Sequence, residues 1–232
     1  MSHPPSACMI LAAGFGTRMG AMTHHRPKPM IEVAGKPLLG HALDQARNAG
    51  AKRIAVNTHY LAEQIAQHLA DQTDVAVLHE SPDILDSGGG VFNALGALGQ
   101  APFWVLNSDN IWSGSNPLTR LAQAWDPARM DALMLLVPLD QTIGREGSDH
   151  LGIGPSGAIS FSSGDLVYTG AQILSPSVFE GCKAGAFPIR PIWEGLARKG
   201  RLHGVLYDGQ WADVGHPEGI ALAEDMLKGC AP

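Results

Sequence analysis

The chain has few cysteines and no long apolar run. Its 232 residues include three cysteines, Cys8, Cys182 and Cys230, without CxxC or other metal-ligand spacing. A sparse, odd number is typical of a reducing compartment, so we expect a cytoplasmic protein. No window approaches the roughly 20 apolar residues of a membrane span. The first residues also lack the basic and apolar regions of a signal peptide, so we expect no membrane partner.

Positive charge is also scarce. The formal net charge is −6 with histidine neutral, whereas nucleic-acid surfaces are normally basic, so we expect no nucleic-acid partner. The ten histidines show neither HxH nor HExxH spacing, which argues against a zinc site. With 45% hydrophobic and 16% charged residues, the composition favours a folded core over disorder.

Short apolar runs alternate with helical patterns as far as Val137. The runs are apolar throughout, as in strands buried on both faces. Alternating strands and helices predict right-handed crossovers and a mostly parallel sheet. The predicted strands are 8–12, 53–57, 75–79, 103–107 and 132–137, and the predicted helices start at Pro37 or cover 61–69, 90–98 and 118–125.

The pattern changes after Pro138. Glycine and serine become dense from 144 to 164, which predicts an antiparallel extension that carries a second substrate. Its strands are expected at 159–161 and 167–174, followed by a helix at 189–199, strands at 202–207 and 211–214, and a helix at 217–228.

No linker separates these parts, so we expect one domain over 1–232, made of a first half (1–137), a second half (138–216) and a C-terminal helix (217–232). The predicted fold class is α/β. It has a Rossmann-like, mostly parallel mixed sheet flanked by helices, with a small antiparallel extension.

A glycine-rich turn follows the first predicted strand. The apolar run at 7–13 leads into a Gly-Phe-Gly turn at 14–16, and such a turn exposes backbone N–H groups where α/β folds bind ligands. Arg18 and Lys28, the latter between two prolines, add a guanidinium and an ammonium. These groups together predict a cradle for the polyphosphate of a nucleoside triphosphate. As a loop residue, Lys28 is expected to be exposed and to matter more to rate than to stability.

Two aspartates stand at the ends of predicted strands. Asp109 follows the apolar run 103–106, and Asp213 ends the segment 211–213. Either alone could be a cap or turn residue. Two carboxylates from distant segments suit one Mg²⁺ that keeps several waters and phosphate oxygens, so Mg²⁺ is the expected cofactor.

The segment 11–19 with 27–29 resembles the signature of the sugar-1-phosphate nucleotidyltransferases. The likeness continues through 33–38, 87–90, 107–109 and 211–215 and so spans almost the whole chain. Within this family the chain is most similar to the bacterial uridylyltransferases of N-acetylmuramate α-1-phosphate. It resembles the mannose-1-phosphate guanylyltransferases and glucose-1-phosphate thymidylyltransferases more distantly.

The resemblance implies a reaction and its substrates. A sugar phosphate oxygen attacks the α-phosphorus of a nucleoside triphosphate, with Mg²⁺, and pyrophosphate leaves. The nearest likeness implies UTP and N-acetylmuramate 1-phosphate, and a role in cell-wall sugar recycling. Both reactants are anions, and two unit charges about 4 Å apart interact by roughly 4 kcal/mol at an effective dielectric of 20, so a cation clamp is needed.

The resemblance also assigns roles to residues. Arg18, Lys28 and Asp109 are the implied catalytic residues, and Asp109 and Asp213 the metal ligands. The first half would bind the nucleotide, through Leu11, Ala12, Ala13, Gly14, Gly16, Thr17, Arg18, Lys28, Gly88, Gly89 and Asn107. The second half would bind the sugar phosphate, through Gly152, Tyr168, Thr169 and Gly170. Roles for Arg190 and His216 stay open.

Two other functions are consistent with the same glycine-rich start. One is a cytidylyltransferase acting on an alcohol phosphate such as phosphocholine, although choline cages need clustered aromatics and this chain is only 6% aromatic. The other is a module that senses nucleotides without turnover. The presence of Lys28, Asp109 and Asp213 favours an enzyme. The longer relatives' trimerising repeat domain is not recognisable, so we expect a monomer or weak homodimer.

Overall fold

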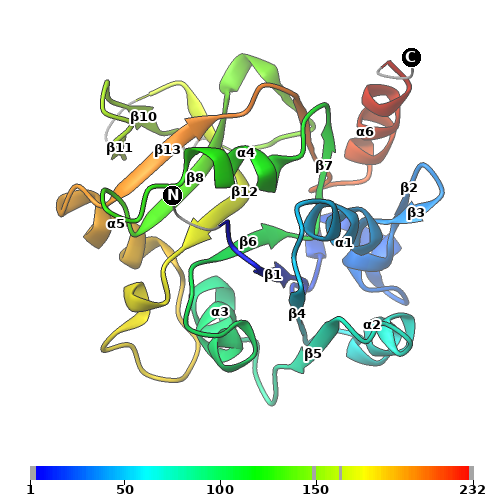
Figure 1. The fold of residues 1–232 in the computed structure, drawn as a ribbon. Coiled ribbons are helices and arrows are strands. Elements are labelled where there is room, and N and C mark those ends of the chain that lie inside the picture. The colour runs from blue at the N-terminus through cyan, green and yellow to red at the C-terminus, as the bar shows by residue number, and fades with distance from the viewer. Residues whose placement is uncertain (1–3, 148–149, 162–163, 230–232) are drawn as a thin grey trace.

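A seven-stranded sheet runs through the middle of the molecule (Figure 1). The computed structural model describes residues 4–147, 150–161 and 164–229. β12 is antiparallel to both of its neighbours, while the other pairs are parallel. In spatial order the strands are β13 (Leu202–Leu206), β8 (Ala132–Pro138), β12 (Leu166–Leu174), β6 (Phe103–Asn107), β1 (Ala7–Leu11), β4 (Arg53–Thr58) and β5 (Val75–His79).

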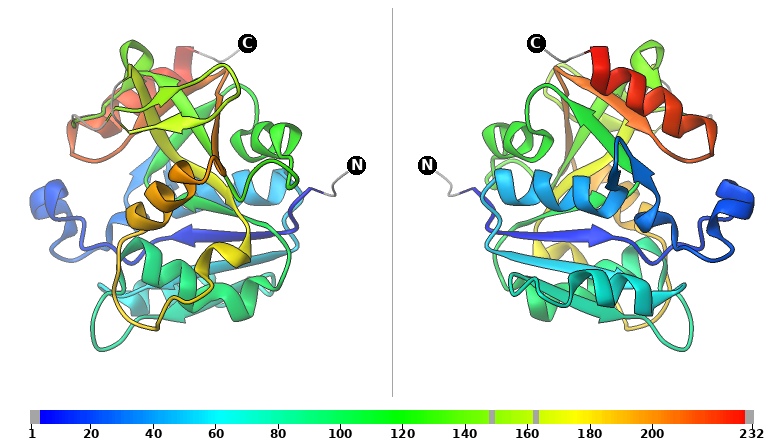
Figure 2. Two further views of the ribbon diagram at one scale, coloured as in Figure 1. Left: turned by 90° about the vertical axis from the view of Figure 1, so that its left-hand side faces the viewer. Right: turned by 90° about the vertical axis from the view of Figure 1, so that its right-hand side faces the viewer.

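Helices cover both faces of this sheet, and Figure 2 shows the two layers from opposite sides. The face with α1, α2 and α4 buries Leu39, Leu43 and Ile65 against Ile10 and Leu106. The face with α3 and α5 forms the second core. The helices are α1 (Leu38–Asn48), α2 (Ala62–Leu69), α3 (Asp86–Leu98), α4 (Pro117–Ala124) and α5 (Arg190–Arg198). In α1 the predicted helical spacing of apolar residues is confirmed, since it places them on one buried stripe.

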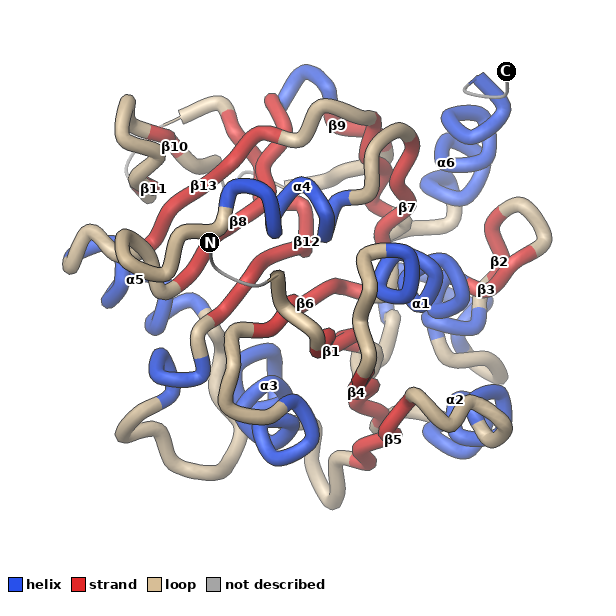
Figure 3. Tube along the Cα trace, viewed as in Figure 1, coloured by secondary structure: helices blue, strands red, loops and turns tan. Residues whose placement is uncertain are grey.

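A third cluster lies beside the main sheet. β14 pairs with β7 and β9 in a small sheet, and α6 packs on it (Figure 3). Met19, Ala212 and Met226 bring the segment after the glycine-rich turn, β14 and α6 into this cluster. The remaining elements are α6 (Glu218–Gly229), β7 (Asn110–Ser113), β9 (Thr142–Ile143), β14 (Gln210–Asp213) and the hairpins β2 (Glu32–Val33) with β3 (Lys36–Pro37) and β10 (Gly152–Ile153) with β11 (Ile159–Ser160).

The predicted fold class is confirmed, with two corrections. The strand expected at 167–174 as part of the extension is β12, which lies inside the large sheet between β8 and β6. β12 is buried along its whole length except at the half-buried Tyr168, as expected for a strand that pairs on both sides. Helix α3 starts at Asp86, four residues before the predicted start, so the glycines after it are helical. Residues 230–232 of the expected C-terminal segment lie outside the described residues.

The strand register brings polar residues to one edge of the sheet. Leu11 ends β1 and pairs with Asn57 of β4 on one side and Asn107 of β6 on the other. The three strands are parallel, so the segments that follow them leave at the same edge. Among the described residues, no helix is both long and apolar enough to cross a membrane.

Candidate active site

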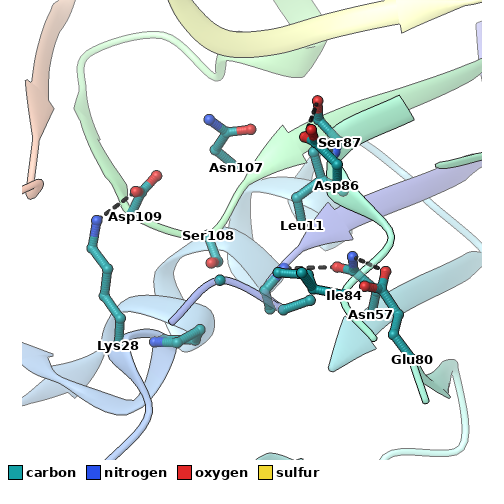
Figure 4. Close-up of a pocket in the computed structure, with 14 residues that line it drawn as sticks. Leu11, Lys28, Asn57, Glu80, Ile84, Asp86, Ser87, Asn107, Ser108 and Asp109 are labelled. Carbon is teal, nitrogen blue, oxygen red and sulfur yellow. Dashed lines mark hydrogen bonds and ion pairs between the residues drawn. The ribbon is translucent and has the colours of Figure 1, made fainter. Parts of the chain in front are cut away.

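A cavity of about 280 Å³ lies at this edge of the sheet. Figure 4 shows Lys28 and Asp109 at one end of it and Asn57 and Glu80 at the other. The cavity therefore has a charged end and an end lined by a buried polar network. Its lining residues are Leu11, Ala12, Ala13, Gly14, Lys28, Pro29, Asn57, Glu80, Ile84, Asp86, Ser87, Asn107, Ser108 and Asp109.

Lys28 and Asp109 form an ion pair at the charged end. The Lys28 Nζ donates to Asp109 Oδ2 at 2.6 Å, and the two side chains are 11% and 25% exposed. The expectation of an exposed loop lysine is therefore wrong. Gly16 explains the burial: it has φ +65°, and a Cβ there would lie 2.8 Å from the Cβ of Lys28. The bare glycine lets the lysine stem pack against the turn.

Asp213 joins this pair from the other end of the chain. β14 runs antiparallel to β7 and pairs Asp213 with Asn110, and the Val214 N–H donates to the Asp109 carbonyl at 3.0 Å. Burial and the Asp109 charge raise the pKa of Asp213, while the charges of Lys28 and nearby arginines lower it. The two acids thus converge, as predicted, although they are far apart in sequence.

Arg18 lies over the segment that follows Asp213. A Cβ at Gly215 would lie 3.1 Å from Nη1 and 3.2 Å from Nη2 of Arg18. Gly215 therefore leaves room for the guanidinium, and the Arg18 charge acts on Asp213. Thr17 begins the 3₁₀ segment Thr17–Thr23 that carries Arg18, and both residues are exposed.

The two aspartates fit a magnesium ion by the chemistry of their donors. Both supply carboxylate oxygens, the ligands that Mg²⁺ prefers. The two negative charges repel each other, so a cation between them stabilises the ionised form of both. In the parts of the chain that the structure describes, no group of three or more His, Cys, Asp or Glu could hold a metal. A two-carboxylate site therefore suits an ion that takes its other ligands from water and phosphate.

Asn57 and Glu80 form the buried network at the opposite end. They are 3% and 2% exposed. Asn57 accepts from the Ala12 N–H at 2.8 Å and donates to Glu80 at 2.7 Å, and Glu80 also accepts from the Leu85 N–H. The Ala12 N–H is thereby occupied, so Ala12 can offer a ligand its carbonyl oxygen only. Neither Asn57 nor Glu80 was among the predicted site residues, although each, like Asp109, stands at the polar end of an apolar run.

Gly88 and Gly89 lie in the first turn of α3. Both N–H groups donate to the Phe187 carbonyl, at 2.9 and 3.0 Å. A Cβ on Gly88 would lie 2.6 Å from the Phe187 ring, and one on Gly89 2.3 Å from the Gly185 carbonyl oxygen. The glycines therefore admit the loop that precedes α5. Among the described residues, Asp86 and Ser87 line the cavity at this turn.

Only some of the residues predicted to bind the sugar phosphate lie at the sheet edge that carries the cavity. Gly170, at φ +80°, makes room for Asn107 and Asn110, whose Nδ2 atoms would lie 2.8 and 2.5 Å from a Cβ. The Thr169 side chain is fully buried and donates to the Leu135 carbonyl at 2.8 Å. This corrects the expectation that its hydroxyl faces the substrate, because the side chain points into the core.

Tyr168 contacts Trp193 of α5 edge-on, with ring centroids 5.0 Å apart, and burial raises the pKa of Tyr168. The Trp193 Nε1–H donates to Gln172 at 2.9 Å. This aromatic pair was not predicted, because it joins β12 to a helix distant in sequence. Gly152 lies in β10, paired with Ser160, in the hairpin that follows β9 in the chain.

Comparisons with known proteins agree with this geometry. Residues 8–142 match the family model described as a MobA-like NTP transferase domain. An N-acetylmuramate alpha-1-phosphate uridylyltransferase of Caulobacter vibrioides is 35% identical, over 98% of this chain and 99% of that protein. One of Neisseria meningitidis is 33% identical, over 89% and 92%. The inositol-1-phosphate CTP transferase from T. maritima is similar in fold, with a TM-score of 0.79, 14% identity and full coverage of both chains.

Proposed function

Because this chain belongs to the sugar-1-phosphate nucleotidyltransferase family and carries its MobA-like NTP transferase domain, we propose that it transfers the uridylyl group of UTP to N-acetylmuramate 1-phosphate, using Mg²⁺. The family makes the chain a nucleotidyltransferase acting on a sugar 1-phosphate. Two relatives, 35% and 33% identical, carry the name N-acetylmuramate alpha-1-phosphate uridylyltransferase, and this agreement supports the choice of base and sugar.

The observation that carries the proposal is the convergence of two acids and two cations. Lys28 contacts Asp109, and Arg18 lies beside the segment that follows Asp213. Lys28 and Asp109 line one end of a cavity whose wall includes residues 11–14, where the glycine-rich turn begins. A triphosphate on that turn would place its phosphates toward the cations and its base toward Asn57 and Glu80.

The reaction needs no protein nucleophile. An oxygen of the sugar phosphate forms a bond to the α-phosphorus, the bond from that phosphorus to the bridging oxygen breaks, and pyrophosphate carries off the electron pair. Mg²⁺ held by Asp109 and Asp213 would supply positive charge at the reacting phosphate. Lys28 stabilises the charge that develops on the pentavalent phosphorus, and Arg18 binds the departing phosphates with its planar fork.

The buried network has a positioning role in this mechanism. Asn57 fixes the Ala12 backbone, and Glu80 fixes both Asn57 and Leu85, so the two walls of the base end are tied together. A fully bonded network in a dry site holds its geometry firmly. We propose that it presents the Ala12 carbonyl and the neighbouring backbone to the edge of the base.

The test is pyrophosphate release from pairs of substrates. The purified chain is given UTP, dTTP, GTP or CTP with N-acetylmuramate, N-acetylglucosamine, glucose or mannose 1-phosphate, with and without Mg²⁺. The expected result is the highest kcat/KM for UTP with N-acetylmuramate 1-phosphate, and no turnover after chelation. A preference for another base or sugar would overturn the substrate assignment. Turnover of CTP with phosphocholine, or nucleotide binding without turnover, would support the two alternatives.

A further inference from the structure

Arg145 is a third cation beside the acid pair, and the mechanism above does not use it. β9 lies parallel to β14, with Ile143 paired to Ala212. One residue further along, Gly144 packs on the backbone of Asp213: a Cβ there would lie 2.6 Å from the Asp213 carbonyl oxygen. Arg145 therefore leaves the strand directly beside the second acid.

The backbone places Arg145 next to that acid. Gly144, the residue before it, packs on the Asp213 carbonyl, and the pairing of β9 with β14 fixes the strand that Arg145 follows. The Arg145 side chain is partly buried. A guanidinium on a long side chain that leaves the backbone here can reach an anion bound at the acid pair.

The origin of Arg145 in the chain indicates which reactant it serves. Arg18 and Lys28 belong to the glycine-rich segment that forms the wall of the cavity. Arg145 comes instead from β9, in the small sheet that also contains Asp213. It approaches the acids from the other half of the chain. A sugar 1-phosphate must also reach the acids, and it is a dianion that a guanidinium can bind through two oxygens at once.

We propose that Arg145 binds the phosphate of the sugar 1-phosphate acceptor, and that His216 is a positioning residue that holds Arg145 in place. This inference rests on the proposed function, since it names the side chain that binds the phosphate of the acceptor substrate. It applies to any sugar 1-phosphate, because the recognised group is the phosphate.

His216 is bonded to the loop that carries Arg145. Its Nε2 lies 2.9 Å from the Gly144 carbonyl, and its Nδ1 lies 3.0 Å from Glu218 Oε2. Both partners are acceptors, so only the imidazolium donates to both at once. The bond to Glu218, then the Gly144 carbonyl and the Glu146 charge, raise the pKa of His216. The Gly144 carbonyl precedes Arg145, so this bond fixes the direction in which the arginine leaves the backbone.

Two-substrate kinetics test the role of Arg145. Arg145→Gln is compared with Arg145→Lys and with a control, Arg120→Gln, in which a half-buried arginine whose Nε donates to the Leu206 carbonyl is replaced. We expect Arg145→Gln to raise the KM of the acceptor at least about 10-fold, the effect of losing a charged hydrogen bond, and to leave the KM of UTP within about 2-fold. Arg145→Lys should recover part of the loss, and Arg120→Gln should match the wild type.

The role of His216 is tested by a double variant. His216→Ala should raise the acceptor KM by about 3-fold to 10-fold, because it loosens the arginine without removing it. Arg145→Gln with His216→Ala should be no worse than Arg145→Gln alone, since residues that act through one another are not additive. A residue with a merely structural role would give an additive loss that affects both substrates.

Several outcomes would overturn the inference. An acceptor KM that stays within 2-fold in Arg145→Gln, with thermal unfolding unchanged, removes Arg145 from the acceptor site. A rise in the KM of UTP instead would assign it to the nucleotide. If Arg145→Gln does not fold, the same comparison is made with Arg145→Lys: the change in the acceptor KM is set against the change in the KM of UTP. Wild-type turnover with any sugar 1-phosphate is measured first, so a failed proposed function appears as an inactive wild type and not as a normal variant.

Discussion

The pair of Lys28 and Asp109 can be measured by a double-mutant cycle on stability. The variants are Lys28→Met, Asp109→Asn and the double, unfolded by urea without divalent cations. The Lys28 Nζ lies 2.6 Å from Asp109 Oδ2, and the side chains are 11% and 25% exposed. At an effective dielectric of 20 the gross attraction is about 6 kcal/mol, most of which desolvation offsets.

Lys28→Met should cost the most. It leaves Asp109 without its partner and beside Asp213, a like charge, so we expect a loss of about 2 kcal/mol, or a fall of about 4–8 °C in Tm for a domain of this size. Asp109→Asn should cost less, because the lysine charge also acts on Asp213. The double variant should lose less than the sum, with a coupling of about 1–2 kcal/mol.

An exposed pair of the same chemistry is the control. Lys36 and Asp44 form an ion pair whose side chains are 39% and 50% exposed. The matching cycle, Lys36→Met with Asp44→Asn, should give a coupling below about 1 kcal/mol. If the coupling of Lys28 with Asp109 is as small as that of the exposed pair, the reasoning that burial by Gly16 strengthens the active-site pair is refuted.

Two further predictions concern backbone space and pH. Gly170→Ala should lose about 2 kcal/mol or more, since its φ is +80° and its Cβ would lie 2.5 Å from Nδ2 of Asn110. Gly181→Ala, at φ +82° with no atom within 4 Å, should lose only about 1 kcal/mol, and equal losses would contradict the role of crowding. Asp131→Asn should cost about 1 kcal/mol at pH 7, because the bond from Arg201 lowers the pKa of Asp131. A lowered pKa gives stability that is present above about pH 4 and lost as the pH falls through the folded value, so urea unfolding of variant and wild type should converge toward pH 3. A difference that is equal at all pH values would contradict this.

The large elements could be predicted because their signals are local. β5 and β6 have the predicted bounds, since each is an apolar run closed by polar residues or turns. The position of β12 could not be predicted, because an apolar strand of that length suits either a central or an edge place. It lies antiparallel between β8 and β6, and this position depends on pairing with two strands that are distant from it in the sequence.

In the site, too, some features could be predicted from the sequence and others could not. Arg18, Lys28, Asp109 and Asp213 carry a signal in residue type and spacing, and the structure brings them together. The burial of Lys28 has no such signal, because it depends on the bare Cα of Gly16 coming against the lysine stem. Arg145 likewise reaches Asp213 only through the pairing of two-residue β9 with β14, which no sequence period marks.

The side chain of Thr169 illustrates the limit on the acceptor side. The sequence around it matched the family pattern, but strand alternation turns its hydroxyl to the Leu135 carbonyl inside the core. Which side of a strand faces a substrate depends on where the strand lies in the sheet. That position was not available from the sequence.

The central claim is that Asp109 and Asp213 act as one site for a divalent cation. The most direct measurement is the rate of pyrophosphate release against free Mg²⁺ for wild type, Asp109→Asn, Asp213→Asn and the double variant, each checked for folding. We predict that each single variant falls at least roughly 10³-fold, about 4 kcal/mol, and that the double is little worse, because removing either ligand disables the site. A folded single variant that keeps its rate within 10-fold and its Mg²⁺ requirement unchanged would contradict the account.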